Sequence, residues 1–133
     1  MKTVFADTYY FIALYVSEDD AHRAAMDFSN GFHGILVTTQ WVLVELADAF
    51  ANPEDRAGIA RMIRTIESQT NVIVIPASDD WFHRGIDLYE KRVDKNWSLT
   101  DCLSFVAMKE RRIKQALTGD RHFEQAGFVA LLK

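Results

Sequence analysis

Four acidic side chains in this sequence could together bind a divalent metal ion: Asp7, Glu45, Asp101 and Asp120. Carboxylate oxygens are hard ligands, and a set of them with no histidine or cysteine ligands beside it favours Mg²⁺ or Mn²⁺ over zinc. One or two such ions would activate a water molecule for hydrolysis of a phosphodiester bond. Asp7, Asp101 and Asp120 would be the main ligands, and Glu45 a ligand or a base that orients the water. Their mutual repulsion should raise some of their pKa values until metal binds.

Three of these acids also have an ordinary structural explanation. Asp7 could cap the helix that follows the first strand. Asp101 is the fourth residue of a capping-box pattern that begins at Ser98. Asp120 could cap a short helix over residues 121–126. A metal site therefore depends on whether the fold brings the acids together.

Glu45 is the acid that a capping role does not explain. It interrupts an apolar helical run, where burial of an unpaired charge costs several kcal/mol or more. It therefore needs either a cation in the site or a basic partner such as Arg61 or Arg64. Asp48 lies one turn further along and could share the face of Glu45, but we expect it to be exposed.

The elements that must position these acids alternate between short apolar strands and helices. We expect strands over Thr3–Ala6, Ile35–Val37, Val72–Ile75, Gln115–Thr118 and Phe128–Leu131. We expect helices over Thr8–Val16, Ala21–Phe28, Gln40–Ala51, Pro53–Ser68, Asp79 to about Arg92, Leu99 to about Arg112, and Arg121–Ala126. This alternation predicts βαβ units and a mostly parallel sheet with helices on both faces. The carboxyl ends of its strands then lie at one edge, where such sheets bind ligands.

Composition indicates one soluble α/β domain. The chain has 133 residues and a net charge of −4, which argues against a protein held to nucleic acid by bulk positive charge but does not exclude a nuclease. Its single cysteine, Cys102, cannot form an internal disulfide. The sequence shows no signal peptide and no apolar run long enough to span a membrane. We therefore expect a cytoplasmic protein without membrane association.

Local basic groups and one histidine stand near the predicted site. The basic groups are Lys91–Arg92, Lys95, and Arg111–Arg112 with Lys114. Solvated faces are their simplest interpretation, although positions flanking the acids would let them bind a phosphodiester backbone. His122 follows Asp120 closely and could orient a phosphate, but we expect a partly exposed structural histidine.

Three segments resemble a known family, the PIN-domain ribonucleases, and in particular the toxins of VapBC-type toxin–antitoxin pairs. The segments are VFADTYYFIALY, TTQWVLVELADAFANP and WSLTDCLSFVAMKERRIKQALTGDRHFEQAGF, at residues 4–15, 38–53 and 97–128. The four acidic positions of the family match Asp7, Glu45, Asp101 and Asp120. The hydroxyl residue of the family ahead of the last acid would be Thr118, in a supporting role.

The resemblance implies a three-layer αβα PIN-like fold over residues 1–133, with a five-stranded, mostly parallel sheet of strand order 3-2-1-4-5. It also implies Mg²⁺ or Mn²⁺ as cofactor and RNA as substrate. Proteins of this kind are usually homodimers that bind a small antitoxin protein. The resulting hypothesis is a metal-dependent endoribonuclease that acts as a toxin. The alternative is a PIN-like RNA-processing nuclease or nucleic-acid-binding protein outside any toxin–antitoxin pair.

Three other classes of protein fit the sequence less well. A haloacid-dehalogenase-like phosphatase needs a second aspartate two residues after Asp7, where this chain has Tyr9. A receiver domain needs a phosphoryl-accepting aspartate after the third strand, where this chain has Ile75–Pro76. A pure interaction module, whose acids only cap helices, predicts no effect of metal on stability.

Overall fold

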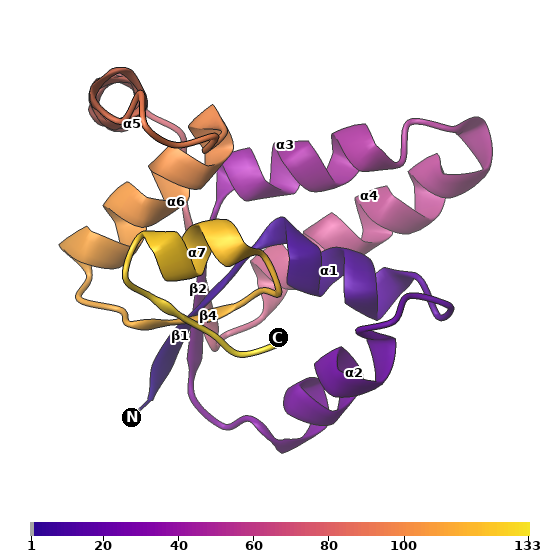
Figure 1. Ribbon diagram of the computed structural model, residues 1–133. Helices are drawn as coiled ribbons and strands as arrows, with labels where there is room; N and C mark the ends of the chain where they lie inside the picture. The colour runs from indigo at the N-terminus through magenta and orange to yellow at the C-terminus, as the bar shows by residue number, and fades with distance from the viewer. Residues whose placement is uncertain (1) are drawn as a thin grey trace.

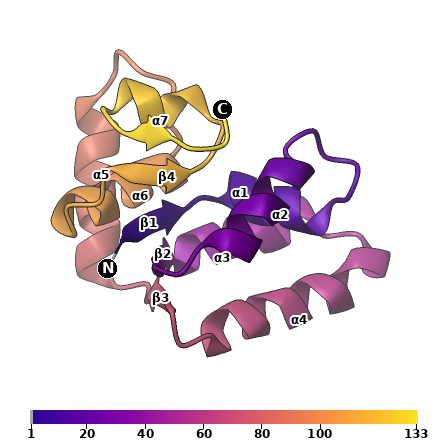
Figure 2. The ribbon, with the colours of Figure 1, turned by 90° about the horizontal axis from the view of Figure 1, so that it is seen from below.

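A single parallel sheet organises the protein, whose computed structural model describes residues 2–133 (Figures 1 and 2). Its five strands are ordered β3-β2-β1-β4-β5, and every neighbouring pair is parallel. The strands are β1 (Thr3–Ala6), β2 (Ile35–Thr39), β3 (Val72–Ile75), β4 (Gln115–Leu117) and β5 (Val129–Ala130). The expected strand order is confirmed. From β1, strands β2 and β3 lie on one side and β4 and β5 on the other, so the switch point of the sheet lies between β1 and β4.

Helices flank this sheet, as expected for three layers. They are α1 (Thr8–Tyr15), α2 (His22–Gly31), α3 (Gln40–Ala49), α4 (Pro53–Ser68), α5 (Asp79–Lys91), α6 (Leu99–Glu110) and α7 (Arg121–Gln125). Figure 2 shows α4 beside β3 at one end of the sheet and α7 at the other end, where it contacts β5. Within residues 2–133, no helix is both long enough and apolar enough to cross a membrane.

Local signals in the sequence explain where the helices around the site begin. The Thr39 hydroxyl caps α3 by accepting a hydrogen bond from the Val42 amide at 3.2 Å. A complete capping box opens α6, as predicted, through reciprocal bonds between Ser98 and Asp101. These caps fix the first turn of each helix, and the helix in turn fixes the direction of its acidic side chain.

Several predicted helix ends differ from the structure by one to three residues, and two of them bear on the packing. The second helix continues through residues 29–31 instead of ending at Phe28, because a single glycine or asparagine costs a helix only about 1 kcal/mol or less. The sixth helix ends at Glu110, so Arg111 and Arg112 do not belong to its last turn. Arg112 has a φ of 57°, a left-handed conformation that turns the chain towards β4.

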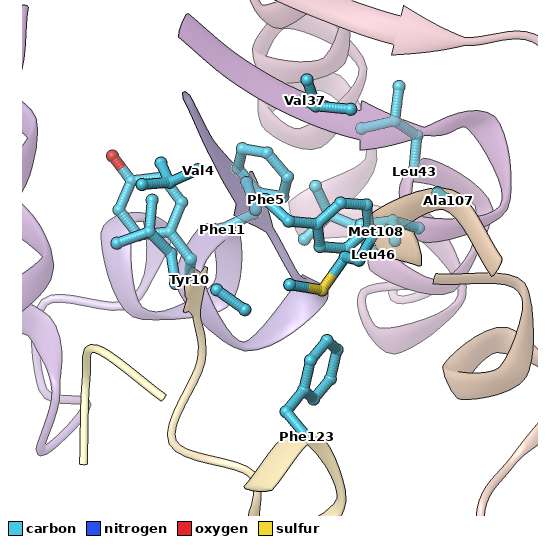
Figure 3. Close-up of a cluster of buried hydrophobic side chains, with 14 of the residues drawn as sticks. Val4, Phe5, Tyr10, Phe11, Val37, Leu43, Leu46, Ala107, Met108 and Phe123 are labelled. Atoms are coloured by element: carbon cyan, nitrogen blue, oxygen red, sulfur yellow. The ribbon is translucent and has the colours of Figure 1, made fainter. Parts of the chain in front are cut away.

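An aromatic cluster anchors α7 to the rest of the fold. Phe123 is fully buried, and its ring lies 4.9 Å from that of Phe105 on α6 and 6.4 Å from that of Phe5 on β1. Figure 3 shows Phe123 pointing towards Met108 in the same core. Truncation of a buried phenylalanine typically costs about 3–5 kcal/mol. The short α7 therefore holds a defined position although it has only five residues.

Candidate metal centre at the carboxyl ends of the strands

All four predicted acids face one pocket of about 410 Å³, which lies where the strand order reverses. Helices α1, α3, α6 and α7 carry most of the residues that line this pocket. Figure 1 shows these four helices around the end of β1. Its lining residues are Asp7, Thr8, Tyr9, Ile12, Glu45, Ala49, Asn96, Ser98, Asp101, Asp120 and His122. Among the described residues, no lysine or arginine lines it. A larger cavity of about 710 Å³ lies elsewhere, and no acid of residues 2–133 lines it, so size alone does not identify the site.

Asp7 directly follows β1 and is 6% exposed. Its side chain makes no capping hydrogen bond to α1, so the interpretation as a simple helix cap is wrong. Its Oδ2 instead accepts a hydrogen bond from the Thr118 hydroxyl at 2.8 Å. The same hydroxyl accepts from the Asp120 amide at 3.0 Å and thus links two of the acids, in agreement with the supporting role expected for Thr118.

The environment of Asp7 disfavours its charged form. Burial is the largest cause, and the negative charges of Asp101 and Glu45 add to it, while the hydrogen bond from Thr118 opposes them. Together they raise the pKa of Asp7 from 3.8 to about 7. A buried acid with this pKa, in a pocket that no lysine or arginine of the described chain lines, indicates a site in which positive charge is missing.

Glu45 projects from the middle of α3 and is half-buried. Its carboxylate accepts a hydrogen bond from the Thr8 hydroxyl, and within residues 2–133 it has no ion pair with Arg61 or Arg64. Burial raises its pKa, with smaller contributions from other acids that include the exposed Asp48, while the bond from Thr8 opposes the rise. The expected repulsion among the carboxylates is therefore confirmed.

Asp101 serves the helix and the pocket at the same time. Its amide donates to the Ser98 hydroxyl at 3.0 Å, and its Oδ2 accepts from the Ser98 amide at 3.1 Å. The side chain is nonetheless part of the pocket wall. Capping and a role in the site are thus compatible for this residue, because the cap is what holds the carboxylate at the start of α6.

Asp120 and His122 complete the cluster from the start of α7. Asp120 caps this helix by accepting a bond from the His122 amide at 2.9 Å. The His122 Nδ1 lies 2.9 Å from Asp101 Oδ2 and 3.6 Å from Asp120 Oδ1. One ligand atom from each of these three residues lies within 4.8 Å of the others, close enough to share a metal ion.

The position of His122 corrects one expectation. The carboxylates do have a histidine beside them, so a preference for Mg²⁺ or Mn²⁺ over zinc now depends on four carboxylates outnumbering one imidazole. The only signal in the sequence was the spacing of His122 two residues after Asp120. Its contact with Asp101 arises from the packing of α7 against α6, which that spacing does not encode.

The basic groups divide between the two ends of α6. This helix runs away from the site for 12 residues, which at 1.5 Å per residue is about 18 Å. Arg111, Arg112 and Lys114 therefore lie at the far edge of the sheet, and the idea that they flank the site is wrong. Lys95 precedes α6 in the loop whose neighbouring residue Asn96 lines the pocket.

An open parallel sheet with a carboxylate pocket at its switch point defines the class of fold, and the sequence identifies the family. Residues 4–129 match the PIN domain, and the chain belongs to the PIN-domain family. The structure is similar to the crystal structure of VapC20 from Mycobacterium tuberculosis, a toxin that cleaves the sarcin–ricin loop. The two share 24% sequence identity with a TM-score of 0.85, over 95% of this chain and 96% of that one, which confirms the fold. No curated protein matches the sequence significantly.

Proposed function

We propose that this protein is a metal-dependent endoribonuclease that hydrolyses RNA phosphodiester bonds, and the toxin of a VapBC-type toxin–antitoxin pair. The observation that supports it most is the meeting of four carboxylates, from distant parts of the chain, around a pocket that no lysine or arginine of residues 2–133 lines. Membership of the PIN-domain family and the fold shared with the VapC20 toxin are consistent with this proposal.

The residues present fit a divalent cation. Asp7 is buried, its pKa is raised to about 7, and no lysine or arginine of residues 2–133 lines its pocket, so a cation there would favour its charged form. Asp7, Asp101, Asp120 and Glu45 would hold the ion, which we propose to be Mg²⁺ or Mn²⁺. When bound, such an ion supplies Lewis acidity, lowering the pKa of a water and stabilising charge on the leaving oxygen.

The protein's own residues would hold the carboxylates in fixed orientations before the ion binds. Thr118 fixes Asp7, Thr8 fixes Glu45, and the capping box fixes Asp101, each through a hydrogen bond to a carboxylate oxygen. Preorganised groups of this kind need not rearrange when charge develops in the transition state. We assign Glu45 the task of orienting the attacking water or accepting its proton, because it lines the pocket from α3 and is less buried than Asp7.

The same proposal covers the assembly, location and partners of the protein. Residues 1–133 would form one PIN-like domain that works in the cytoplasm as a homodimer. Its partners would be an RNA substrate and a small antitoxin protein. Growth arrest after expression in a bacterial host, relieved by Asp7→Asn, would support the toxin role, and unimpaired growth with active wild-type protein present would contradict it.

The nuclease activity is tested by incubating the purified protein with defined RNAs in Mg²⁺, in Mn²⁺ and in EDTA. Wild-type protein should cleave at internal positions in either metal and should stop in EDTA. Asp7→Asn should abolish cleavage while leaving the fold intact. Asp27→Asn is the matched control, because Asp27 lies on α2 with its side chain 71% exposed. Cleavage that persists in EDTA, or at the wild-type rate in Asp7→Asn, would reject the proposal.

A further inference from the structure

We propose that His122 is a positioning residue that fixes the Asp101 carboxylate for metal binding. This inference rests on the proposed function, because it assigns a role within the same site. His122 contacts both acids at the end of the pocket formed by α6 and α7: its Nδ1 lies 2.9 Å from Asp101 Oδ2, and its amide donates to Asp120 Oδ1 at 2.9 Å. One residue thus joins two carboxylates that would otherwise repel each other.

The hydrogen bonds on Asp101 show how the contact with His122 would orient its carboxylate. A carboxylate only accepts hydrogen bonds, so the Nδ1 of His122 carries the proton and donates it. The Ser98 amide donates to the same oxygen, Oδ2, at 3.1 Å. Both bonds fall on Oδ2, which leaves Oδ1 of Asp101 to bind a cation. Rotation of the carboxylate would break both bonds, so together they fix its plane.

His122 is itself held rigidly enough to act in this way. The next residue, Phe123, is fully buried between the rings of Phe5 and Phe105. Three residues after His122 on α7, Gln125 accepts a hydrogen bond at 3.0 Å from the indole of Trp97, which directly precedes the capping box of α6. The imidazole therefore reaches Asp101 from a backbone that is packed against the same helix.

The inference predicts different results for two substitutions of similar size. In asparagine the amide nitrogen occupies the same place along the side chain as Nδ1, so His122→Asn can still donate to Asp101. In glutamine the nitrogen stands one bond further out, in the place of Nε2, so His122→Gln loses that donor. Outer-sphere partners of metal ligands typically contribute about 10- to 100-fold to metal affinity. We therefore expect His122→Gln to weaken Mn²⁺ binding by about that factor, and His122→Asn to stay close to the wild-type protein.

The experiment is a calorimetric titration of the 133-residue chain with Mn²⁺ for the wild type and both variants. Melting temperatures in EDTA, which should be similar for all three, provide the control for folding. Tight binding by His122→Gln, or binding by His122→Asn as weak as that of His122→Gln, would overturn the role of His122 alone. Absence of Mn²⁺ binding by the wild-type protein would reject the metal centre itself, and this inference with it.

A spectroscopic measurement reports the proposed bond directly. Long-range ¹H–¹⁵N spectra of the metal-free protein show which ring nitrogen of His122 carries the proton. The inference requires Nδ1. A ring protonated only on Nε2 cannot donate to Asp101 and would contradict it.

Discussion

The metal-free protein should become more stable when Asp7 is replaced by asparagine, and the gain should depend on pH. Asparagine has nearly the same shape, and its amide oxygen can still accept the hydrogen bond from Thr118. What the substitution removes is a carboxylate that burial and neighbouring charges hold in an unfavourable ionised state at neutral to alkaline pH.

The sign follows from the two pKa values. The pKa of Asp7 is about 7 in the folded protein and about 3.8 in the unfolded chain, so folding takes up a proton between these pH values. The stability that depends on this proton is fully present below pH 3.8 and is lost as the pH rises through about 7. At about 1.4 kcal/mol per pH unit, the full loss is about 4 kcal/mol for the wild-type protein. An uncharged asparagine avoids this loss.

The advantage of Asp7→Asn over the wild type should therefore grow by about 2.5 kcal/mol between pH 5 and pH 8. For a domain of this size that corresponds to a difference in melting temperature on the order of 10 °C. The assay is thermal unfolding in EDTA at both pH values. Asp27→Asn, at an exposed position, should show no such change. An Asp7→Asn variant that is equally or less stable than wild type at pH 8, with no dependence on pH, would refute the reasoning.

Substitutions of Thr118 test the hydrogen bonds that hold the acids, and a substitution of Lys95 tests whether this residue contacts the RNA backbone. Thr118→Val removes a fully buried hydroxyl that bonds Asp7 and the Asp120 amide, and should cost about 1–3 kcal/mol in urea denaturation, whereas Thr118→Ser should retain most of the stability. RNA binding is measured in a non-cleaving Asp7→Asn background. There, Lys95→Ala should reduce the slope of log affinity against log salt concentration by about 0.7. Lys114→Ala, at the far edge of the sheet, should leave this slope unchanged. Equal effects of the two lysine substitutions would contradict this placement.

Local patterns in the sequence were enough to predict the elements that carry the site. The capping box at Ser98–Asp101 and the short apolar segments at β1 and β4 depend on neighbouring residues, so their positions could be read directly. The burial of Glu45 in an apolar run likewise indicated a charge that needed compensation. The order of the strands was expected only through the resemblance to PIN domains, because pairing of distant strands is not visible in local patterns.

Contacts between distant elements were the part that the sequence could not give. An arginine was the expected alternative partner of Glu45, but the structure supplies the Thr8 hydroxyl at the start of α1. The contact of His122 with Asp101 depends on how α7 packs against α6. The distance of Arg111 and Arg112 from the site, in contrast, follows from the sequence alone. A helix of 12 residues is about 18 Å long, so residues after its end cannot flank a site at its start.

The most direct test of the account is to locate the cation. Crystals soaked in Mn²⁺ and measured at the manganese absorption edge would show the ion by its anomalous scattering. The account predicts a peak in the pocket at the ends of β1 and β4, with oxygens of Asp7 and Asp101 or Asp120 among its ligands. A pocket without anomalous density at saturating Mn²⁺, with the acids instead neutralised by protons or by a basic side chain, would contradict it.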